Sequence, residues 1–447
     1  MCMTNGREYT DQSQITGREL GDVEGFLQDV ISRMMPEPEG DTARGRPRIL
    51  PALALWAGLL VCVLRGFTSQ LALWRLLTQG NFWFFPRFPV SDQAVYKRLA
   101  QAGTAPLERL FQQIRDLLAV RLEPFAQRSL APFATEVFAL DETTLDRIAR
   151  MLPGLRGVPN ADPRLLPGKL AAIFDLRRQM WRYVEHIPDS QQNEKVAAPS
   201  LVERLPKGSL ILADLGYFGF AWFDWLTDAG YWWISRLRSK TSYVVLHRYY
   251  QQGDTFDGVV FLGKYRADQA AHAVRLVQFR VKGKLYSYVT NVLDPKTLPI
   301  RMIAELYARR WDIELAIKLV KRELKLHLLW SSKPVIILQQ IWATLIIAQI
   351  LQALRLEIAG RAKVDIFDVS MPLLVEYLPK TAYTGQDPIQ LFVERGRELR
   401  LIRPSTRNVI EGPIIAEDTI RPLPPDLVLI RRPRYAERNC HRRSKPN

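Results

Sequence analysis

Four side chains of different chemistry recur at helical spacing within residues 301–328: Tyr307, Arg310, Glu314 and Lys321. In a helix, which turns about 100° per residue, all four would project within one stripe about 60° wide. Glu can hold a divalent metal through its oxygens, whereas Arg and Lys neutralise phosphate. Tyr offers a hydroxyl to a phosphate oxygen and a ring face to a base. The pattern therefore indicates either a ridge that binds metal and phosphate or a solvated helix face with an Arg310–Glu314 pair.

The same stretch carries a second, apolar stripe beside the polar one. It consists of Leu306, Ile313, Ile317, Val320 and Leu324. An apolar stripe at this period is typical of a helix face that packs on a core. The sequence thus predicts one helix over 301–328 that lies on the core by one edge and presents the four polar side chains from the adjoining edge.

Two aspartates follow short apolar runs earlier in the chain. Asp141 follows 136–140 (EVFAL), and Asp214 follows 208–213 (GSLILA). Each alone is typical of a turn or a helix cap, but a carboxylate at the end of a buried strand is costly unless a positive charge compensates it. Together with Glu314 they form a suitable set for a pair of Mg²⁺ ions, which can clamp the attacking and leaving oxygens of a phosphoryl transfer.

The residues around these acids predict an α/β sheet. Further strands are expected at 169–175, 180–187 and 231–237, with helices at 195–204 and 218–229. Residues 242–291 alternate between apolar and polar positions and contain turn signals, which predicts a β-rich insertion before the helix at 301. Open sheets of this class gather their ligands at strand ends. After residue 331 the periodicity predicts further helices at 334–359, 366–379 and 387–400.

Composition narrows the classes of partner. The chain has 447 residues, 47% of them hydrophobic, and a formal charge of +16. These values indicate a folded protein with more than one domain and favour nucleic acid as a partner, although a ribosomal or an anionic membrane surface also fits the charge. The three cysteines form no CxxC pair, which argues against structural zinc or disulfides and favours a reducing compartment. The apolar run 49–64 is too short to span a bilayer, so no membrane partner is expected.

The sequence of the N-terminal third predicts either a helical DNA-binding domain or a helical cap that only packs against the rest of the protein. Helices are expected at 50–65, 69–79, 91–102 and 105–121. Ser91 is a suitable N-cap for a recognition helix with Lys97 and Arg98 facing outward. Arg46 lies in a short RGRPR segment that resembles the core of AT-hook peptides, which insert Arg into a narrow minor groove; the alternative is a plain basic linker.

The order of motifs resembles a known family. ALDETT, LADLGYF, a β-rich insertion and then YARRWDIELAIKLVK resemble the DDE transposases of bacterial insertion sequences. More narrowly, they resemble the insertion-sequence-four (Tn-five/Tn-ten-like) family with its Tyr-Arg-Glu-Lys signature. The resemblance covers about residues 136–330.

This resemblance implies a ribonuclease-H-like (retroviral-integrase-like) catalytic core with a β-rich insertion, flanked by helical N-terminal and C-terminal regions. It implies Asp141, Asp214 and Glu314 as catalytic ligands of two Mg²⁺ ions, for which Mn²⁺ is expected to substitute. Glu142, directly after the first acid, is an alternative ligand. The DNA contacts are then Tyr307, Arg310 and Lys321, with a Trp that stacks a flipped base; the candidates for it are Trp232, Trp233 and Trp311.

The resemblance also implies the function of the whole chain. We expect a DNA transposase that binds the ends of an insertion sequence as a homodimer and catalyses Mg²⁺-dependent strand cleavage and strand transfer in the bacterial cytoplasm, at the nucleoid. The alternatives are a catalytically inactive or domesticated DNA-binding relative and a host nuclease on the same core. The N-terminal part is expected to consist of a disordered segment with a short helix and a basic linker (1–48), followed by a helical DNA-binding domain (49–130). The core is expected in two parts, 131–238 and 296–330 with the Glu314 helix, separated by the β-rich insertion (239–295). A helical C-terminal region (331–430) and a basic tail (431–447) are expected to follow.

Overall fold

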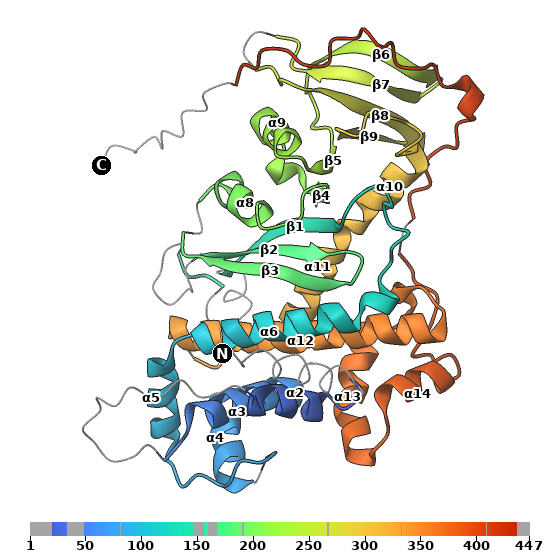
Figure 1. Cartoon of the computed structure of the whole chain (residues 1–447). Helices are drawn as coiled ribbons and strands as arrows, with labels where there is room; N and C mark the ends of the chain where they lie inside the picture. Colours follow the sequence, from blue (N-terminus) through green and yellow to red (C-terminus); the bar gives the residue numbers. More distant parts are fainter. Residues whose placement is uncertain are drawn as a thin grey trace, which may run out of the picture.

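The computed structural model describes residues 20–33, 49–80, 82–145, 156–159, 168–189, 192–265, 268–331, 333–407 and 409–435. Within these residues the chain builds a mixed α/β fold around one nine-stranded sheet with the order β3-β2-β1-β4-β5-β9-β8-β7-β6. A layer of helices lies at the bottom of the view in Figure 1, and the β-rich end of the same sheet lies at the top.

The first five strands form the half of the sheet that carries the aspartates. They are β1 (Val137–Thr144), β2 (Lys169–Asp175), β3 (Met180–Ile187), β4 (Leu210–Ala213) and β5 (Trp232–Arg236). The first three strands pair antiparallel, whereas β4 and β5 run parallel to β1. Two helices, α8 (Glu194–Val202) and α9 (Phe220–Asp228), provide the crossovers to the parallel strands. The expected α/β sheet is therefore confirmed.

The β-rich segment continues this sheet. It contains β6 (Tyr243–Gln252), β7 (Thr255–Leu262), β8 (Ala273–Val281) and β9 (Lys284–Thr290). The last of these strands pairs antiparallel with β5 over Ile234–Arg236. The alternating pattern at 242–291 thus predicted the strands, but not their continuity with the sheet before them.

The helix predicted over 301–328 is interrupted. The segment consists of α10 (Ile300–Arg309), α11 (Trp311–Lys318) and a π-helical turn at Leu319–Glu323, and it leaves helical geometry at Leu324. The prediction of one regular helix was wrong because side-chain periodicity does not register a local change in backbone hydrogen bonding. Such π turns are rare and often lie at functional sites.

The helical layer is built around α12 (Pro334–Ala362). This 29-residue helix is long and apolar enough to cross a membrane by composition, but 83% of its most apolar window is buried inside the protein. It packs against α6 (Ala105–Arg121), α3 (Ala52–Leu64) and α14 (Pro388–Arg395), and α6 lies alongside it in Figure 1. The layer also contains α4 (Gln70–Gln79), α5 (Asp92–Ala102) and α13 (Met371–Thr384).

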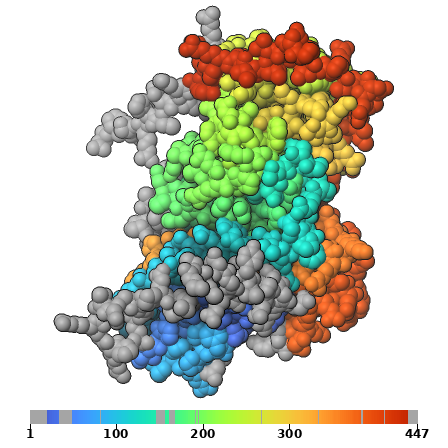
Figure 2. Space-filling view, in the orientation of Figure 1, coloured from blue at the N-terminus to red at the C-terminus, as the bar shows by residue number. Residues whose placement is uncertain are grey.

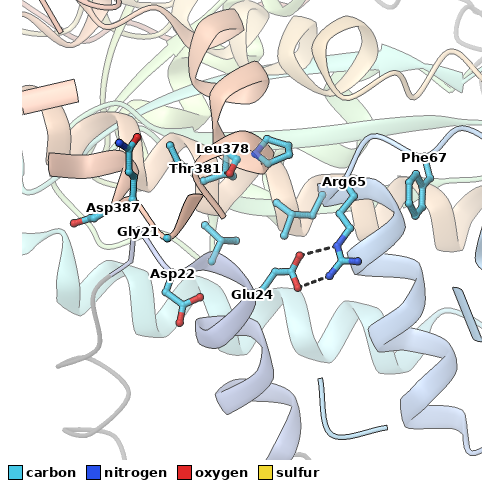
Figure 3. A pocket seen from close by; sticks show the side chains of 13 residues that line it. Gly21, Asp22, Glu24, Arg65, Phe67, Leu378, Thr381 and Asp387 are labelled. Carbon is cyan, nitrogen blue, oxygen red and sulfur yellow. Dashed lines mark hydrogen bonds and ion pairs between the residues drawn. The ribbon is translucent and has the colours of Figure 1, made fainter. Parts of the chain in front are cut away.

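The N-terminal helix α2 (Val23–Ser32) is fixed to this layer by an ion pair. Arg65, at the end of α3, donates two hydrogen bonds of 2.8 Å to the carboxylate of Glu24. The Trp83 indole donates a third to the same group. Glu24 and Arg65 border a cavity of about 580 Å³ that is also lined by residues of α13 and of the turn before α14 (Figure 3).

The helical C-terminal region predicted over 331–430 is helical only as far as Arg395, apart from a 3₁₀ turn at Glu417–Thr419. The described residues from 409 to 435 run as an extended arm over the β-rich end, where Figure 2 shows them covering the surface. The arm is held by backbone hydrogen bonds from Arg421 to Tyr249 and from Arg431 to Ala271. Five prolines within residues 413–433 disfavour regular helix here.

Candidate active site

The register of the sheet places Asp141 and Asp214 side by side. The parallel pairing of β1 with β4 ends with Leu140 opposite Ala213. Asp141 and Asp214 are the residues that directly follow this last pair. Neighbouring strands lie about 4.8 Å apart. Asp214 ends β4 as predicted, whereas Asp141 lies inside β1, because antiparallel pairing with β2 extends that strand to Thr144.

Glu314 approaches the two aspartates from α11, which packs on β1. Burial raises the pKa of Asp141 to about 7, and the negative charges of Glu314 and Asp214 act in the same direction. The Glu142 backbone N–H and the Arg310 guanidinium lower it. The three acids therefore lie within electrostatic reach of one another, although Asp141 and Glu314 are 173 residues apart in the sequence.

The acids do not form a ready-made metal site. Among the residues described by the structure, no three His, Cys, Asp or Glu side chains are close enough to hold one ion. Glu314 instead accepts a hydrogen bond of 2.6 Å from Nη2 of Arg310, which supplies the positive charge beside it. The donor chemistry nonetheless fits a hard divalent cation, because the three carboxylates offer only oxygen ligands.

Tyr307 is the member of the predicted stripe that the structure buries. Its side chain is 8% exposed, and its ring lies 5.2 Å from that of Tyr288 on β9, centroid to centroid. Burial raises the pKa of Tyr307, while the Arg310 guanidinium lowers it. The ring face is thus used for packing, and the expectation that it is presented outward was wrong. Tyr307 continues the buried face of α10 that Ile300, Ile303 and Ala304 form.

Lys321 reaches the same strand as Asp141. Its Nζ lies 2.6 Å from Oγ1 of Thr143. Thr143 is two residues beyond Asp141, so both side chains project from the same face of β1. Sequence analysis missed Thr143, although the period of two from Asp141 was a signal that could have identified it.

Part of the chain is similar to known transposases. Residues 164–350 match the family model of the transposase DDE domain. Asp214 and Glu314 lie inside the matched range, and Asp141 lies before it.

Two proteins to which the chain is similar are transposases. The chain is 25% identical over 187 residues to the Escherichia coli K12 transposase InsG of insertion sequence element IS4, covering 39% of this chain and 41% of that protein. It is 25% identical over 272 residues to the putative transposase y4zB of Sinorhizobium fredii, covering 56% of this chain and 72% of that protein. The resemblance to insertion-sequence-four transposases is confirmed at this level of sequence identity. The chain spans about two fifths of the length of the first relative.

A solved structure also resembles the fold in outline. The piggyBac transposase, in a synaptic complex with hairpin DNA, aligns with a TM-score of 0.40 at 10% identity, over 92% of this chain and 87% of that one.

Of the three tryptophan candidates, Trp311 lies on the helix that carries Glu314 and is the most exposed. Trp311 is 52% exposed, and the Arg310 guanidinium lies 5.7 Å from its ring. Trp233 is buried and stacks on Phe223 at 4.2 Å, while Trp232 packs edge-on against Phe133. Only Trp311 among the three candidates combines an open ring face with a position on the Glu314 helix.

Glu142 forms an ion pair with a lysine away from the other acids. Its carboxylate pairs with Nζ of Lys169 at 2.5 Å, and both side chains are at least 95% buried. Because neighbouring residues of a strand project to opposite faces, Glu142 points away from the face that carries Asp141. This geometry disfavours Glu142 as a metal ligand.

The remaining predicted DNA contacts are not gathered at the acids. Lys97 and Arg98 lie on α5, in the helical layer (Figure 1), with Lys97 exposed and Arg98 half-buried. Ser91 caps this helix through Ala94, as predicted. Arg46 lies outside the described residues.

Proposed function

We propose that this protein is a DNA transposase that binds the ends of an insertion sequence and cleaves and joins DNA strands by two-metal chemistry. The observation that carries the proposal is the adjacency of Asp141 and Asp214 in parallel register, with Glu314 on the helix packed against the first strand. The DDE domain match and the two transposase relatives support the same function. We take β1–β5 with α11 as the ribonuclease-H-like core, and the predicted domain boundaries remain part of the proposal.

Asp141, Asp214 and Glu314 are the residues that would hold divalent cations, with Mg²⁺ as the favoured ion and Mn²⁺ as a substitute. Bound there, the ions would supply the charge that activates the attacking oxygen and stabilises the leaving oxygen. A cation would also relieve the repulsion among three carboxylates of which Asp141 is strongly desolvated. For Glu314 to join the other acids, it must release Arg310.

The released Arg310 then has a second role. Its guanidinium lies between Glu314 and the exposed ring of Trp311, so it can turn to a DNA phosphate without leaving the site. Lys321, fixed beside Thr143, supplies a second phosphate contact on the strand face that carries Asp141. Tyr307 positions Arg310 from below, and its hydroxyl remains the third candidate contact.

DNA is the proposed partner, bound by a homodimer that bridges two element ends in the bacterial cytoplasm. The net charge of +16 suits a polyanion. Trp311 offers a stacking surface for an unpaired base. Lys97, Arg98 and Arg46 are proposed as contacts farther along the duplex.

The experiment that tests this function uses DNA with the terminal repeats that flank the gene. Purified protein with Mg²⁺ is expected to cut at the repeat boundary and to join the freed 3′ end to target DNA, as read on a sequencing gel. DNA with scrambled repeats is the control. Specific binding without cutting would contradict the proposal in favour of an inactive relative, and cutting without end specificity would favour a host nuclease.

A further inference from the structure

A second cavity lies one helical turn beyond Glu314 on the same helix. Its volume is about 410 Å³, and it is bounded by α11 with the π turn, by α12, by the start of α13 and by residues 403–406. The residues used below are Lys318, Gln352, Arg355, Ser370 and Arg403, all of which line it.

The floor of this cavity contains buried polar groups without partners. Arg355 is 8% exposed, and its Nε donates to the Val369 carbonyl at 2.9 Å. Its two Nη groups make no hydrogen bond to any residue that the structure describes. Gln352, three residues earlier on α12, is 3% exposed, and its Oε1 has no partner among the described residues. The two Nη groups of Arg355 therefore offer donors to an anion in the cavity. Gln352 Oε1 is an acceptor, so it would pair with a donor and not with an anion.

Arg355 forms no ion pair with a carboxylate among the described residues. Three guanidinium groups surround the Phe367 ring, those of Arg309, Arg355 and Arg407, at 5.3, 5.3 and 4.3 Å from its centroid. Asp312 is the carboxylate among them, and it pairs with Arg309 at 2.6 Å and with Arg407 at 2.9 Å. Burial lowers the pKa of Arg355 to about 10, with Asp312 and Asp365 opposing this effect.

The rim adds further groups that attract an anion. Lys318 and Arg403 are exposed cations on opposite sides of the opening. The 14-residue helix α13 begins here, with Ser370, Met371 and Pro372 lining the cavity. Its N-cap Ser370 makes no side-chain capping bond, and the positive end of the helix dipole lies at the cavity. Two acids also line the cavity, Glu323 and Asp368, and Asp368 already accepts from the Ser405 N–H at 2.9 Å.

We propose that this cavity binds a phosphate group through Arg355, with the N-terminus of α13 and the Arg403 side chain closing around it. A guanidinium fork and a helix N-terminus are donors that suit a phosphate oxyanion. The cavity in Figure 3 differs, because its carboxylates Glu24, Asp22 and Asp387 are all hydrogen-bonded within the protein.

The favoured source of the phosphate is the backbone of the DNA strand held at the acids, and this choice rests on the proposed function. The cavity opens beside Lys318, four residues after Glu314, so a strand leaving the acids can continue along α11 into it. Free inorganic phosphate or a nucleotide presents the same chemistry, and the experiment separates the two sources.

The experiment compares wild type with Arg355→Gln and Arg403→Gln, and uses Arg397→Gln as the control. Arg397 is an exposed arginine that does not line the cavity. All measurements are made in EDTA, so they do not depend on cleavage. Thermal unfolding is recorded in phosphate and in chloride at equal ionic strength. Binding of an element-end DNA is recorded from low to high salt.

Phosphate is expected to raise the melting temperature of wild type and Arg397→Gln but not that of Arg355→Gln. In Arg403→Gln, phosphate should raise the melting temperature by less than in wild type. This variant changes only the rim of the cavity, so the test remains valid if Arg355→Gln fails to fold. If DNA is the source, Arg403→Gln also lowers the slope of log K against log salt by about 0.9, the value for one phosphate contact, and Arg397→Gln does not. A phosphate effect without a change in slope would support the site and overturn DNA as its source. No phosphate effect in wild type would overturn the site itself, whether or not the protein cleaves DNA.

Discussion

Asp214→Asn is expected to reduce Mg²⁺-dependent cleavage of an element end by about 1000-fold while leaving binding of that DNA unchanged. The substitution removes a charge that would hold the cation, and the several kcal/mol of charge stabilisation supplied by a metal correspond to a loss of this size. It changes little else, because the oxygen of Asn can still accept the hydrogen bond that Asp214 takes from the Gly216 N–H. Cleavage on a gel and binding by anisotropy are the two measurements.

The matched control for this prediction is Asp254→Asn. Asp254 is an exposed carboxylate on the β-rich end that pairs with Arg280 at 3.0 Å. The Asp254→Asn substitution removes the same charge far from the acids, so cleavage should continue at the wild-type rate. If Asp214→Asn also cleaved at the wild-type rate in Mg²⁺, Asp214 would not be a metal ligand.

Asp257→Ala is expected to destabilise the protein by about 3–5 kcal/mol, the usual effect of leaving one partner of a buried ion pair alone. Asp257 on β7 and Arg275 on β8 are 2% and 0% exposed and form two hydrogen bonds of 2.6 and 2.7 Å. Arg275 also donates to the Leu298 carbonyl at 2.6 Å, immediately before the helix segment that leads to Glu314. Losing Asp257 should therefore loosen the connection between the β-rich end and the candidate active site.

Thermal unfolding measures this second effect, with Asp254→Ala as the comparison. Because the Asp254–Arg280 pair is exposed on both sides, its loss should cost at most about 1 kcal/mol. Equal destabilisation by the two variants would show that the buried pair does not secure the β-rich end.

The sequence located the acids because their signals are local. An apolar run followed by Asp predicts a carboxylate at a strand end, and this placed Asp214 correctly and put Asp141 on the right strand. The stripe on 301–328 identified Glu314, Arg310 and Lys321 as neighbours, and the structure keeps all three near β1. Family resemblance added the roles that spacing alone left open.

The sequence could not show features that depend on pairing between distant segments. The pairing of β5 with β9 makes the insertion part of the main sheet, and no local pattern records a strand partner. Thr143 meets Lys321 across 178 residues. Arg309, Arg355 and Arg407 meet around Phe367 only because α10, α12 and the C-terminal segment converge there. Tyr307 packs inward against Tyr288 of the distant strand β9, and the periodicity of the helix does not record that partner.

The position of Mn²⁺ in a crystal of the protein with an element-end DNA tests the central claim most directly. Anomalous scattering identifies the ion and the atoms that hold it. We predict Mn²⁺ bound by oxygens of Asp141 and Asp214, with Glu314 released from Arg310 and turned to the same cluster. Mn²⁺ bound elsewhere, with Asp141 and Asp214 making no contact to any ion and Glu314 still paired with Arg310, would contradict the account.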